Sequence, residues 1–560
     1  FWDCSSLTSI GVPTTVTEIT SGCFKGCTAL SSVTLPDGIV SIGHSAFAGC
    51  GALSGISIPA NVSDIGSRVF HGCAELASID VAPGNTIYAS HGGVLFDFAM
   101  SNVIRCPEGR TGTYAIPSGV GEISAFAFAN CSRLIDIAIP DGVTSIGSSA
   151  FSGCSALASI SLPPSITVVP SDAFSDCVGL EIVAIPLSVS EIYPGAFSNC
   201  RSLTSITIPT SVEFIGDGAF LNCSSLTSIS IPTSTSTISL FSFAGCSSLK
   251  SIQVEPGNPT YSSLDGILFN AAKTVLIRCP EGKSGKVPVQ EGVTYIAGVY
   301  AWGDGHGGGI EGEGAFAGCS QLTSILIPES VTGIGGYVFD GCSQLQSITV
   351  VPGNSSYASV NGVLYDASLT QLLRCPEGMT GAYSIPSGVT RIGDTQFSFW
   401  HPFVSPRGFA NCTQLTQVTI PRSVTEIGRF VFSGCPATRT YEGYPDAPWL
   451  VSHGLPYNTG LNQDLNHDGV SLLMAYALDL DPNANLSQQM PTPVLTADSL
   501  TITFHAAAPG ITYIVQTSTD LQTWTTTGVT LSEPDLNGMV TGSVDRDGAR
   551  HFLQLVVIRQ

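Results

Sequence analysis

The sequence has few charged residues, and it lacks any long apolar run. Charged residues make up 11 % of its 560 residues, and 42 acidic residues against 20 basic ones give a net charge of −22. An acidic surface repels phosphate backbones, so we expect no nucleic-acid partner. No apolar stretch reaches the roughly 18 residues that a spanning helix requires, so we expect no membrane span.

Motifs of enzymes and zinc sites are missing as well. The chain contains neither a G-x-S-x-G elbow nor an H-E-x-x-H motif, and it has no C-x-x-C pair. Nucleophilic hydrolases, zinc proteases and structural zinc sites therefore have no support in the sequence. We expect a protein that is not an enzyme and that needs no cofactor, apart from the calcium considered below.

Cysteine, in contrast, is frequent and recurs at a fixed period. Most of the 18 cysteines fall into four groups, and within each group every step is 23 residues. The groups are Cys4, Cys27, Cys50 and Cys73; Cys131, Cys154, Cys177, Cys200, Cys223 and Cys246; Cys319 and Cys342; and Cys412 and Cys435. Such a period indicates a repeat array, in which each unit buries its apolar face only by stacking on its neighbours.

One unit shows how the chain would fold into a coil. Apolar residues alternate over 203–208, which predicts a short strand with one face inward. Pro209 ends the strand because it cannot donate a ladder hydrogen bond. Gly216 is expected to allow a tight bend, Phe220 to fill the centre, and Cys223 to pack as a small apolar group.

The repeated pattern C-x-x-L-x-x-I-x-I-P-x-x-V-x-x-I-G-x-x-A-F-x-x-C resembles the BspA-like leucine-rich repeat over residues 1–435. This resemblance implies a right-handed repeat solenoid that is β-rich, has a parallel sheet on one face and contains little helix. It also implies a bacterial protein that is secreted or displayed on the cell surface and binds other molecules. Because Phe1 matches Phe24, in the middle of a later repeat, we expect that residues upstream of the given sequence are missing.

Three longer units interrupt the 23-residue period, after Cys73, Cys246 and Cys342. Each contains a variant of PGNxxYxSxxGVLF followed by RCPEG, which predicts a strand, a turn and a second strand. The Arg and Glu of the last motif are expected to hold a turn as a local ion pair. These pairs are Arg105 and Glu108, Arg278 and Glu281, and Arg374 and Glu377.

The periodic cysteines should form one buried column, either as thiols or as disulfides. Neighbours in the column would lie about 4.8 Å apart, which is within the Cα range of a disulfide. Parallel side chains in register, however, point the same way, whereas a disulfide needs a dihedral angle near 90°. The thiol form is therefore favoured.

Two insertions suggest where a ligand binds. Ile215 and Phe220 are five residues apart, but the matching gaps from Ile296 to Phe316 and from Ile392 to Phe409 are twenty and seventeen. Binding residues tend to lie on loops held by a rigid scaffold. The ligand-binding candidates in these insertions are Tyr300, Trp302, His306, Phe399, Trp400, His401 and Phe403. The alternative is that these side chains fold back over the solenoid edge.

The C-terminal quarter changes character and divides into three segments. Residues 436–458 resemble the terminal cap of the repeat family, 459–490 an acidic EF-hand or dockerin-like segment with a short helix, and 491–560 a small antiparallel β module. Trp524 is expected to anchor the core of this module.

The acidic segment leaves two interpretations open. Asp464, Asn466 and Asp468 occupy the first, third and fifth positions of an EF-hand-like loop, but the twelfth is Ala475 where a bidentate acid belongs. A structural linker and a weak calcium site are both consistent with this pattern.

Together these features favour an exported or cell-surface adhesion protein that recognises a protein or another extracellular surface ligand as a monomer. A spacer that displays another domain is the alternative, and an enzyme is the least favoured.

Overall fold

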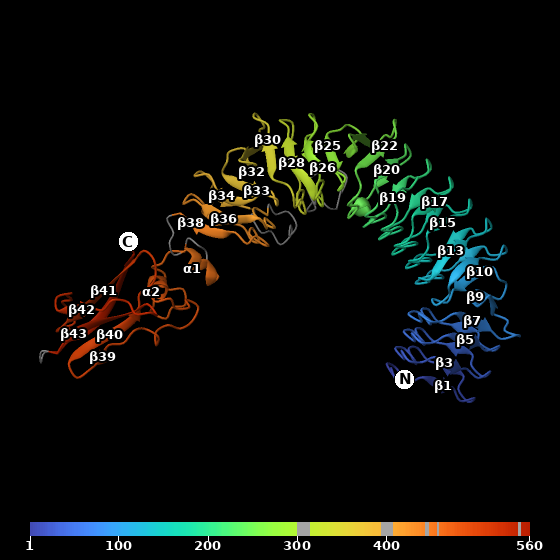
Figure 1. Ribbon diagram of the computed structural model, residues 1–560, viewed down its shortest axis with the longest axis horizontal. Coiled ribbons are helices and arrows are strands. Elements are labelled where there is room, and N and C mark those ends of the chain that lie inside the picture. Colours follow the sequence, from blue (N-terminus) through green and yellow to red (C-terminus); the bar gives the residue numbers. More distant parts are fainter. Residues whose placement is uncertain (299–313, 394–406, 443–446, 456–458, 547–549, 560) are drawn as a thin grey trace. The chain divides into compact units, whose positions relative to one another are not determined.

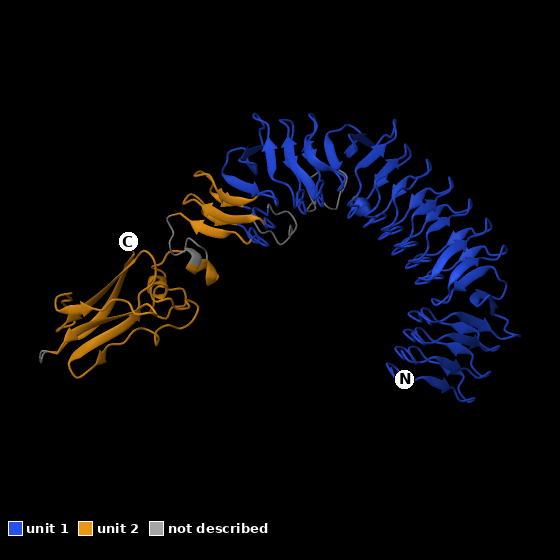
Figure 2. Ribbon diagram, viewed as in Figure 1, with its two compact units in different colours: residues 1–379, 393–413, 428–435 blue, residues 380–392, 414–427, 436–560 orange. Residues whose placement is uncertain are grey.

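The computed structural model describes residues 1–298, 314–393, 407–442, 447–455, 459–546 and 550–559. The chain divides into two compact units, shown in different colours in Figure 2. Unit 1 comprises residues 1–379, 393–413 and 428–435, and unit 2 comprises 380–392, 414–427 and 436–560. None of the helices in the described part of the chain has the length and apolarity that a bilayer crossing requires.

Unit 1 is an array of stacked coils whose strands form two parallel rows (Figure 1). The first row comprises β1 (Ser9–Gly11), β3 (Ser32–Thr34), β5 (Gly55–Ile58), β7 (Ser78–Val81), β11 (Gly112–Ala115), β13 (Leu134–Ala138), β15 (Ser159–Ser161), β17 (Ile182–Ala184), β20 (Ser228–Ile231), β22 (Ser251–Val254), β26 (Ser284–Pro288), β28 (Gln321–Ile327) and β30 (Ser347–Val350). The second row comprises β2 (Glu18–Ile19), β4 (Ser41–Ile42), β6 (Asp64–Ile65), β12 (Glu122–Ile123), β14 (Ser145–Ile146), β16 (Val168–Val169), β18 (Glu191–Ile192), β19 (Phe214–Ile215), β21 (Thr237–Ile238), β27 (Tyr295–Ile296) and β29 (Gly333–Ile334). The one helical element of unit 1 among the described residues is the 3-10 turn η1 (Leu240–Phe243).

The predicted register is confirmed by the strand pairing. Ile160 of β15 pairs with Val183 of β17, which is one period of 23 residues further along the chain. Both side chains are buried, whereas the flanking Ser159 and Ser161 are exposed. Equal coil length therefore places apolar residues in register on the inside, as the alternation predicted.

Phenylalanine and cysteine form the two inner columns. The rings of Phe151 and Phe174 are stacked with 5.2 Å between centroids, and those of Phe174 and Phe197 with 5.4 Å. The Sγ of Cys177 donates to the carbonyl of Phe151 at 3.1 Å, and Cys200 repeats this bond to Phe174 at 3.2 Å. The cysteines are present as thiols, and these two bonds each link a coil to the one before it.

A turn before each column cysteine adopts a left-handed backbone conformation. Asn199 and Asn222 have φ angles of 61° and 60°, and Gly153 has 75°. Side chains with a branched Cβ are strained there, whereas Gly, Asn and Asp tolerate it. The amide of Asn222 also donates to the Asn199 side-chain oxygen at 3.0 Å, which ties adjacent coils together.

Gly216 is needed for a different reason than the one predicted. Its φ does not lie in the left-handed region, so backbone freedom is not what the position requires. A Cβ added there would lie 2.6 Å from the backbone nitrogen of Pro194 in the preceding coil. The glycine therefore serves close approach between coils rather than a tight bend.

Each long unit forms a three-stranded antiparallel meander, one strand more than the sequence predicted. The meanders comprise β8 (Tyr88–His91), β9 (Val94–Asp97) and β10 (Asn102–Arg105); β23 (Tyr261–Leu264), β24 (Ile267–Asn270) and β25 (Val275–Arg278); and β31 (Tyr357–Val360), β32 (Val363–Asp366) and β33 (Gln371–Arg374). The tyrosine that begins each meander accepts a hydrogen bond from an isoleucine N–H one coil earlier. These bonds are Tyr88 with Ile65 at 3.1 Å, Tyr261 with Ile238 at 2.9 Å, and Tyr357 with Ile334 at 3.0 Å.

Unit 2 contains coil strands followed by the antiparallel module. Its elements are β34 (Gly381–Ser384), β35 (Arg391–Ile392), β36 (Leu415–Ile420), β37 (Glu426–Ile427), β38 (Thr438–Tyr441), α1 (Ala447–Ser452), α2 (Leu472–Ala477), β39 (Val494–Leu495), β40 (Ser499–His505), β41 (Ile511–Ser518), β42 (Val529–Leu531), β43 (Met539–Asp545) and β44 (Phe552–Arg559). The module consists of the antiparallel sheet β39-β40-β43-β42 and the pair β41-β44. Ile502, Phe504 and Val515 lie in its core, whereas Trp524 is only half-buried, so the predicted anchoring role of Trp524 is wrong.

Candidate binding site

The aromatic and histidine candidates of the two insertions lie outside the described residues. They are Tyr300, Trp302, His306, Phe399, Trp400, His401 and Phe403, within 299–313 and 394–406. The flanks of both insertions are described. Ala315 donates to the carbonyl of Ala297 at 2.8 Å, and Gly408 donates to the carbonyl of Leu373 at 3.2 Å. The chain therefore returns to the solenoid in hydrogen-bonded register after each insertion.

The outward face of the first strand row is lined by small hydroxyl side chains. Ser32, Thr34, Ser159, Ser161, Ser205, Thr207, Ser228 and Ser230 are all exposed. These small side chains are not the Trp, Tyr and Arg residues that dominate binding hot spots. This face is therefore a weaker candidate than a site with charge and depth.

The recurring Arg-Cys-Pro-Glu motif forms the predicted ion pair in all three long units. In the second, Arg278 Nη2 lies 2.6 Å from Glu281 Oε1, and both side chains are buried. Glu281 also accepts from the backbone N–H of Gly245 in an earlier coil at 2.8 Å. The pairs Arg105–Glu108 and Arg374–Glu377 repeat this geometry. The motif is a structural clasp between coils.

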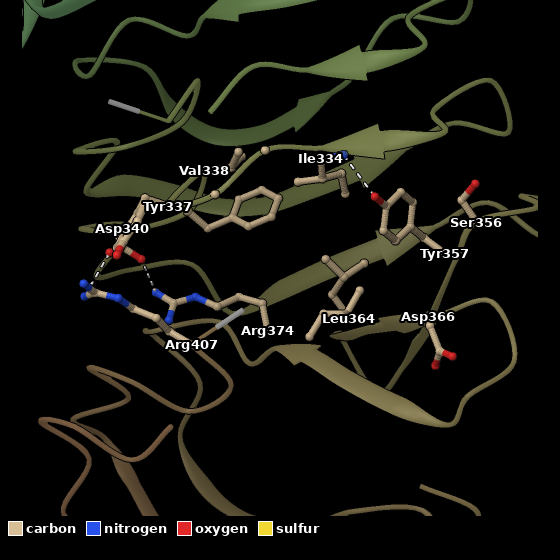
Figure 3. A pocket seen from close by; sticks show the side chains of 14 residues that line it. Ile334, Tyr337, Val338, Asp340, Ser356, Tyr357, Leu364, Asp366, Arg374 and Arg407 are labelled. Carbon is tan, nitrogen blue, oxygen red and sulfur yellow. Dashed lines mark hydrogen bonds and ion pairs between the residues drawn. The ribbon is translucent and has the colours of Figure 1, made fainter. Parts of the chain in front are cut away.

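A cavity of about 330 Å³ lies beside the third of these clasps (Figure 3). Its lining comes from three segments of unit 1, namely residues 334–340, residues 356–374 and Arg407. The walls between its two ends are mostly apolar and include Ile334, Val338 and Leu364. Pockets of this size and composition are typical of small-molecule sites.

One end of the cavity carries two arginines around a single acid, as Figure 3 shows. Asp340 lies 3.2 Å from Arg374 Nη2 through one carboxylate oxygen and 3.2 Å from Arg407 Nη1 through the other. Arg374 is buried and also bound to Glu377, whereas the side chain of Arg407 is 37 % exposed. The guanidinium of Arg407 lies over the ring of Tyr337, 4.5 Å from its centroid. Arg407 is thus the accessible cation of this site.

The other end carries Tyr357, Ser356 and Asp366 (Figure 3). Burial raises the pKa of Tyr357, so its hydroxyl keeps its proton at neutral pH. Partial burial acts to raise the pKa of Asp366, but hydrogen bonds from Ser368 and from the Gln371 N–H outweigh it and lower the pKa. A protonated phenol and an ionised carboxylate therefore lie at this end.

This cavity was not predicted from the sequence, although two local signals mark it. Gly335 and Gly336, which have no side chains, come directly after Ile334. Arg407 comes directly after the second insertion. Asp340 stands two residues before its column cysteine, where the other long units have His71 and Ala244. The acid between two arginines is thus peculiar to the third long unit.

The acidic segment in unit 2 forms its own hydrogen-bonded turn. Asp464 accepts from the N–H of Gly469 at 2.9 Å, and Asp468 accepts from the N–H of Val470 at 2.9 Å and from that of Leu486. The amide of Asn466 donates to Asp468 at 3.1 Å. Within the described residues, no group of three His, Cys, Asp or Glu side chains is placed to hold a metal ion.

Comparison with solved structures returns leucine-rich repeat proteins. One from Eubacterium ventriosum is 27 % identical with a TM-score of 0.38, and the match covers 43 % of this chain and 77 % of that one. A leucine-rich cell surface protein from Faecalibacterium prausnitzii is 23 % identical with a TM-score of 0.37, covering 81 % and 92 %. One from Bacteroides ovatus is 22 % identical with a TM-score of 0.35, covering 77 % and 86 %. A search of curated proteins gave no match.

The family comparison is more specific. The BspA-type leucine-rich repeat region matches in six copies, over residues 1–92, 121–250, 168–273, 310–401 and 382–442. These ranges cover more than half of the chain, and they agree with the stacked coils and inner columns described above. The protein therefore belongs to the BspA-type leucine-rich repeat family.

Proposed function

We propose that this protein is an exported or cell-surface binding protein that recognises a protein or another extracellular surface ligand as a monomer. Family membership supports this proposal, because BspA-like repeats occur mostly in surface or secreted binding proteins. The solenoid supplies a rigid scaffold, and the insertions and the cavity supply the contact surface. The proposed function requires no chemical reaction of the ligand.

The position of Arg407 is the observation that most supports this proposal. It is the first described residue after the second insertion, and it lines the cavity. The insertion that holds Phe399, Trp400, His401 and Phe403 therefore ends at the cavity's arginine end. Aromatic residues and arginine are the residue types that dominate binding hot spots.

A panel of extracellular matrix proteins and polysaccharides, immobilised for biolayer interferometry against the full chain, tests the proposal. We expect at least one member of the panel to bind saturably. The double variant Trp302→Ala/Trp400→Ala should lose that binding while its melting temperature stays unchanged. Phe98→Ala is the matched control, because Phe98 is a 59 % exposed aromatic residue in the first long unit.

Two outcomes would count against this proposal. Unchanged binding by the tryptophan variant would remove the insertions from the contact surface. A chain that binds no member of a broad panel would favour the spacer function, in which the solenoid only displays another domain.

For the acidic segment, we propose a structural linker rather than a calcium site. Ala475 stands at the twelfth position, where a bidentate acid belongs, and Asp464 and Asp468 serve as acceptors for backbone N–H groups of the turn. Calorimetric titration of the full chain with calcium should give no saturable heat. A saturable heat that Asp464→Asn removes would show a calcium site instead.

A further inference from the structure

We infer that the cavity beside Arg407 binds a small amphipathic carboxylate, a ligand with an apolar body and one anionic end. This inference deepens the proposed binding function and rests on it. It names a ligand class for a site lined by described residues alone, and it assigns a separate role to each end of the cavity.

Asp340 and Glu377 balance the charges of Arg374 and Arg407, so the arginine end offers an anion free N–H donors rather than excess charge. Asp340 lies at 3.2 Å from both arginines, so its two oxygens are already engaged. Arg374 is also held by Glu377 and by the carbonyl of Ala410, and its side chain is buried. Arg407 has Asp340 as its one ion-pair partner among the described residues, and it is partly exposed. A planar guanidinium has five N–H donors, so Arg407 retains donors for a carboxylate.

The ring of Tyr337 holds Arg407 in place for this role. The guanidinium stacks on the ring at 4.5 Å, and its Nη1 bonds to Asp340. An arginine fixed on two sides loses little side-chain freedom when a ligand binds. The remaining edge of the guanidinium can therefore form paired hydrogen bonds to a carboxylate at small entropic cost.

Apolar walls and limited volume define the body of the ligand. Ile334 and Leu364 lie between the two ends (Figure 3), and the cavity of about 330 Å³ is near the lower limit for small-molecule pockets. A single ring with a short alkyl chain fits this description better than a sugar, which would leave its hydroxyl groups without partners against these walls.

The far end offers a hydrogen-bond donor. The Tyr357 oxygen accepts from the N–H of Ile334 at 3.0 Å, which leaves its own proton pointing elsewhere. A phenol keeps its proton at neutral pH, and burial raises the pKa of this one further. A ligand with an acceptor at its far end would gain one further bond here.

The test uses 4-phenylbutyrate and its neutral amide, 4-phenylbutyramide, as probes with the full-length protein in calorimetry or ligand-observed NMR. We expect saturable binding of the carboxylate and at least tenfold weaker binding of the amide. Arg407→Gln should weaken the carboxylate at least tenfold, because it removes a bond between two opposite charges, and should weaken the uncharged amide much less. Arg201→Gln, which removes an exposed arginine elsewhere in unit 1, is the control.

A second variant keeps the test decisive if Arg407→Gln disturbs the fold. Ser356→Trp would fill the cavity from its far end and should abolish binding of both probes. Ile87→Trp places the same side chain at the equivalent position of the first long unit and should leave binding intact. Equal affinity for the two probes, binding that survives Ser356→Trp, or no binding of either probe would overturn the inference. The last result, together with tryptophan-dependent binding to the matrix panel, would reject this ligand class and leave the proposed function standing.

Discussion

Arg407 stacks on the ring of Tyr337 at 4.5 Å, and the first long unit contains the same contact with its partners exchanged. There Arg68 lies over the ring of Phe126 at 5.4 Å. All four residues stand five positions before a column cysteine, so the two contacts occupy equivalent places. In the first and third long units, the same two backbone positions are therefore paired, and the arginine can occupy either of them.

This exchange predicts that the pair in the third long unit can be reversed. Tyr337→Arg alone should destabilise the fold, because it places a third arginine beside Arg374 and Arg407. The double variant Tyr337→Arg/Arg407→Phe should recover about 1 kcal/mol of that loss, because it restores an arginine over a ring. Chemical denaturation of the two single variants and the double variant measures the coupling. Strictly additive effects would show that the two positions do not interact.

The clasp predicts a large loss of stability when its buried acid is replaced. Replacing an exposed acid in another ion pair should have no effect on stability. Glu281→Ala should lower the unfolding free energy by about 3 kcal/mol, because Arg278 then remains buried without its carboxylate. Glu75→Ala breaks an ion pair of the same length, 2.6 Å, between exposed side chains and should leave stability unchanged. Similar losses in the two variants, measured by urea denaturation, would contradict the structural role of the motif.

Close coil packing predicts that Gly216 tolerates no side chain. Gly216→Ala should destabilise the fold by about 3 kcal/mol, because its Cβ would collide with backbone atoms of the preceding coil. Gly119→Ala is the control, since a Cβ at that position meets nothing within 4 Å. A melting temperature of Gly216→Ala equal to that of Gly119→Ala would show that the coils are less tightly stacked.

Buried thiols predict a loss of stability in alkaline solution. Burial raises the pKa of Cys177 and Cys223 from 9.0 to about 12. Below pH 9 both the folded and the unfolded chain keep these protons, and the full stabilisation is present. As pH rises from 9 toward 12, the unfolded chain loses its thiol protons first, and the unfolding free energy falls by up to roughly 4 kcal/mol per thiol.

The measurement is a series of denaturation curves between pH 8 and pH 11, in which buried tyrosines also contribute. The double variant Cys177→Ala/Cys223→Ala should therefore show a shallower decline than the parent chain. Identical slopes would indicate that the two thiols ionise as readily in the folded chain as in the unfolded one.

The repeat and its inner columns could be predicted because each depends on residues within one period. A step of 23 residues fixes which side chains face inward, and stacking follows from the need to bury them. The ion pair of the clasp was also predictable, because Arg278 and Glu281 are three residues apart, but the bond from Gly245 of an earlier coil to Glu281 was not. The role of Gly216 was not, because the atoms it approaches belong to another coil.

The cavity could not be predicted for a similar reason. Asp340, Arg374 and Arg407 are 34 and 33 residues apart in the sequence, and only the long unit between them brings their charges together. The candidate residues of the insertions, including Trp302 and Trp400, carry no periodic constraint, and their role stays a prediction.

In-register stacking is the claim on which the cavity, the clasp and the columns all depend, and thiol accessibility tests it most directly. Cys4 is exposed and Cys23 half-buried, whereas the sixteen other cysteines are buried. Alkylation of the native chain at pH 8, followed by peptide mass spectrometry, should label Cys4 rapidly and Cys23 more slowly. The remaining cysteines should react only after denaturant is added. Rapid labelling of Cys177 or Cys200 at the rate of Cys4 would contradict the stacked columns.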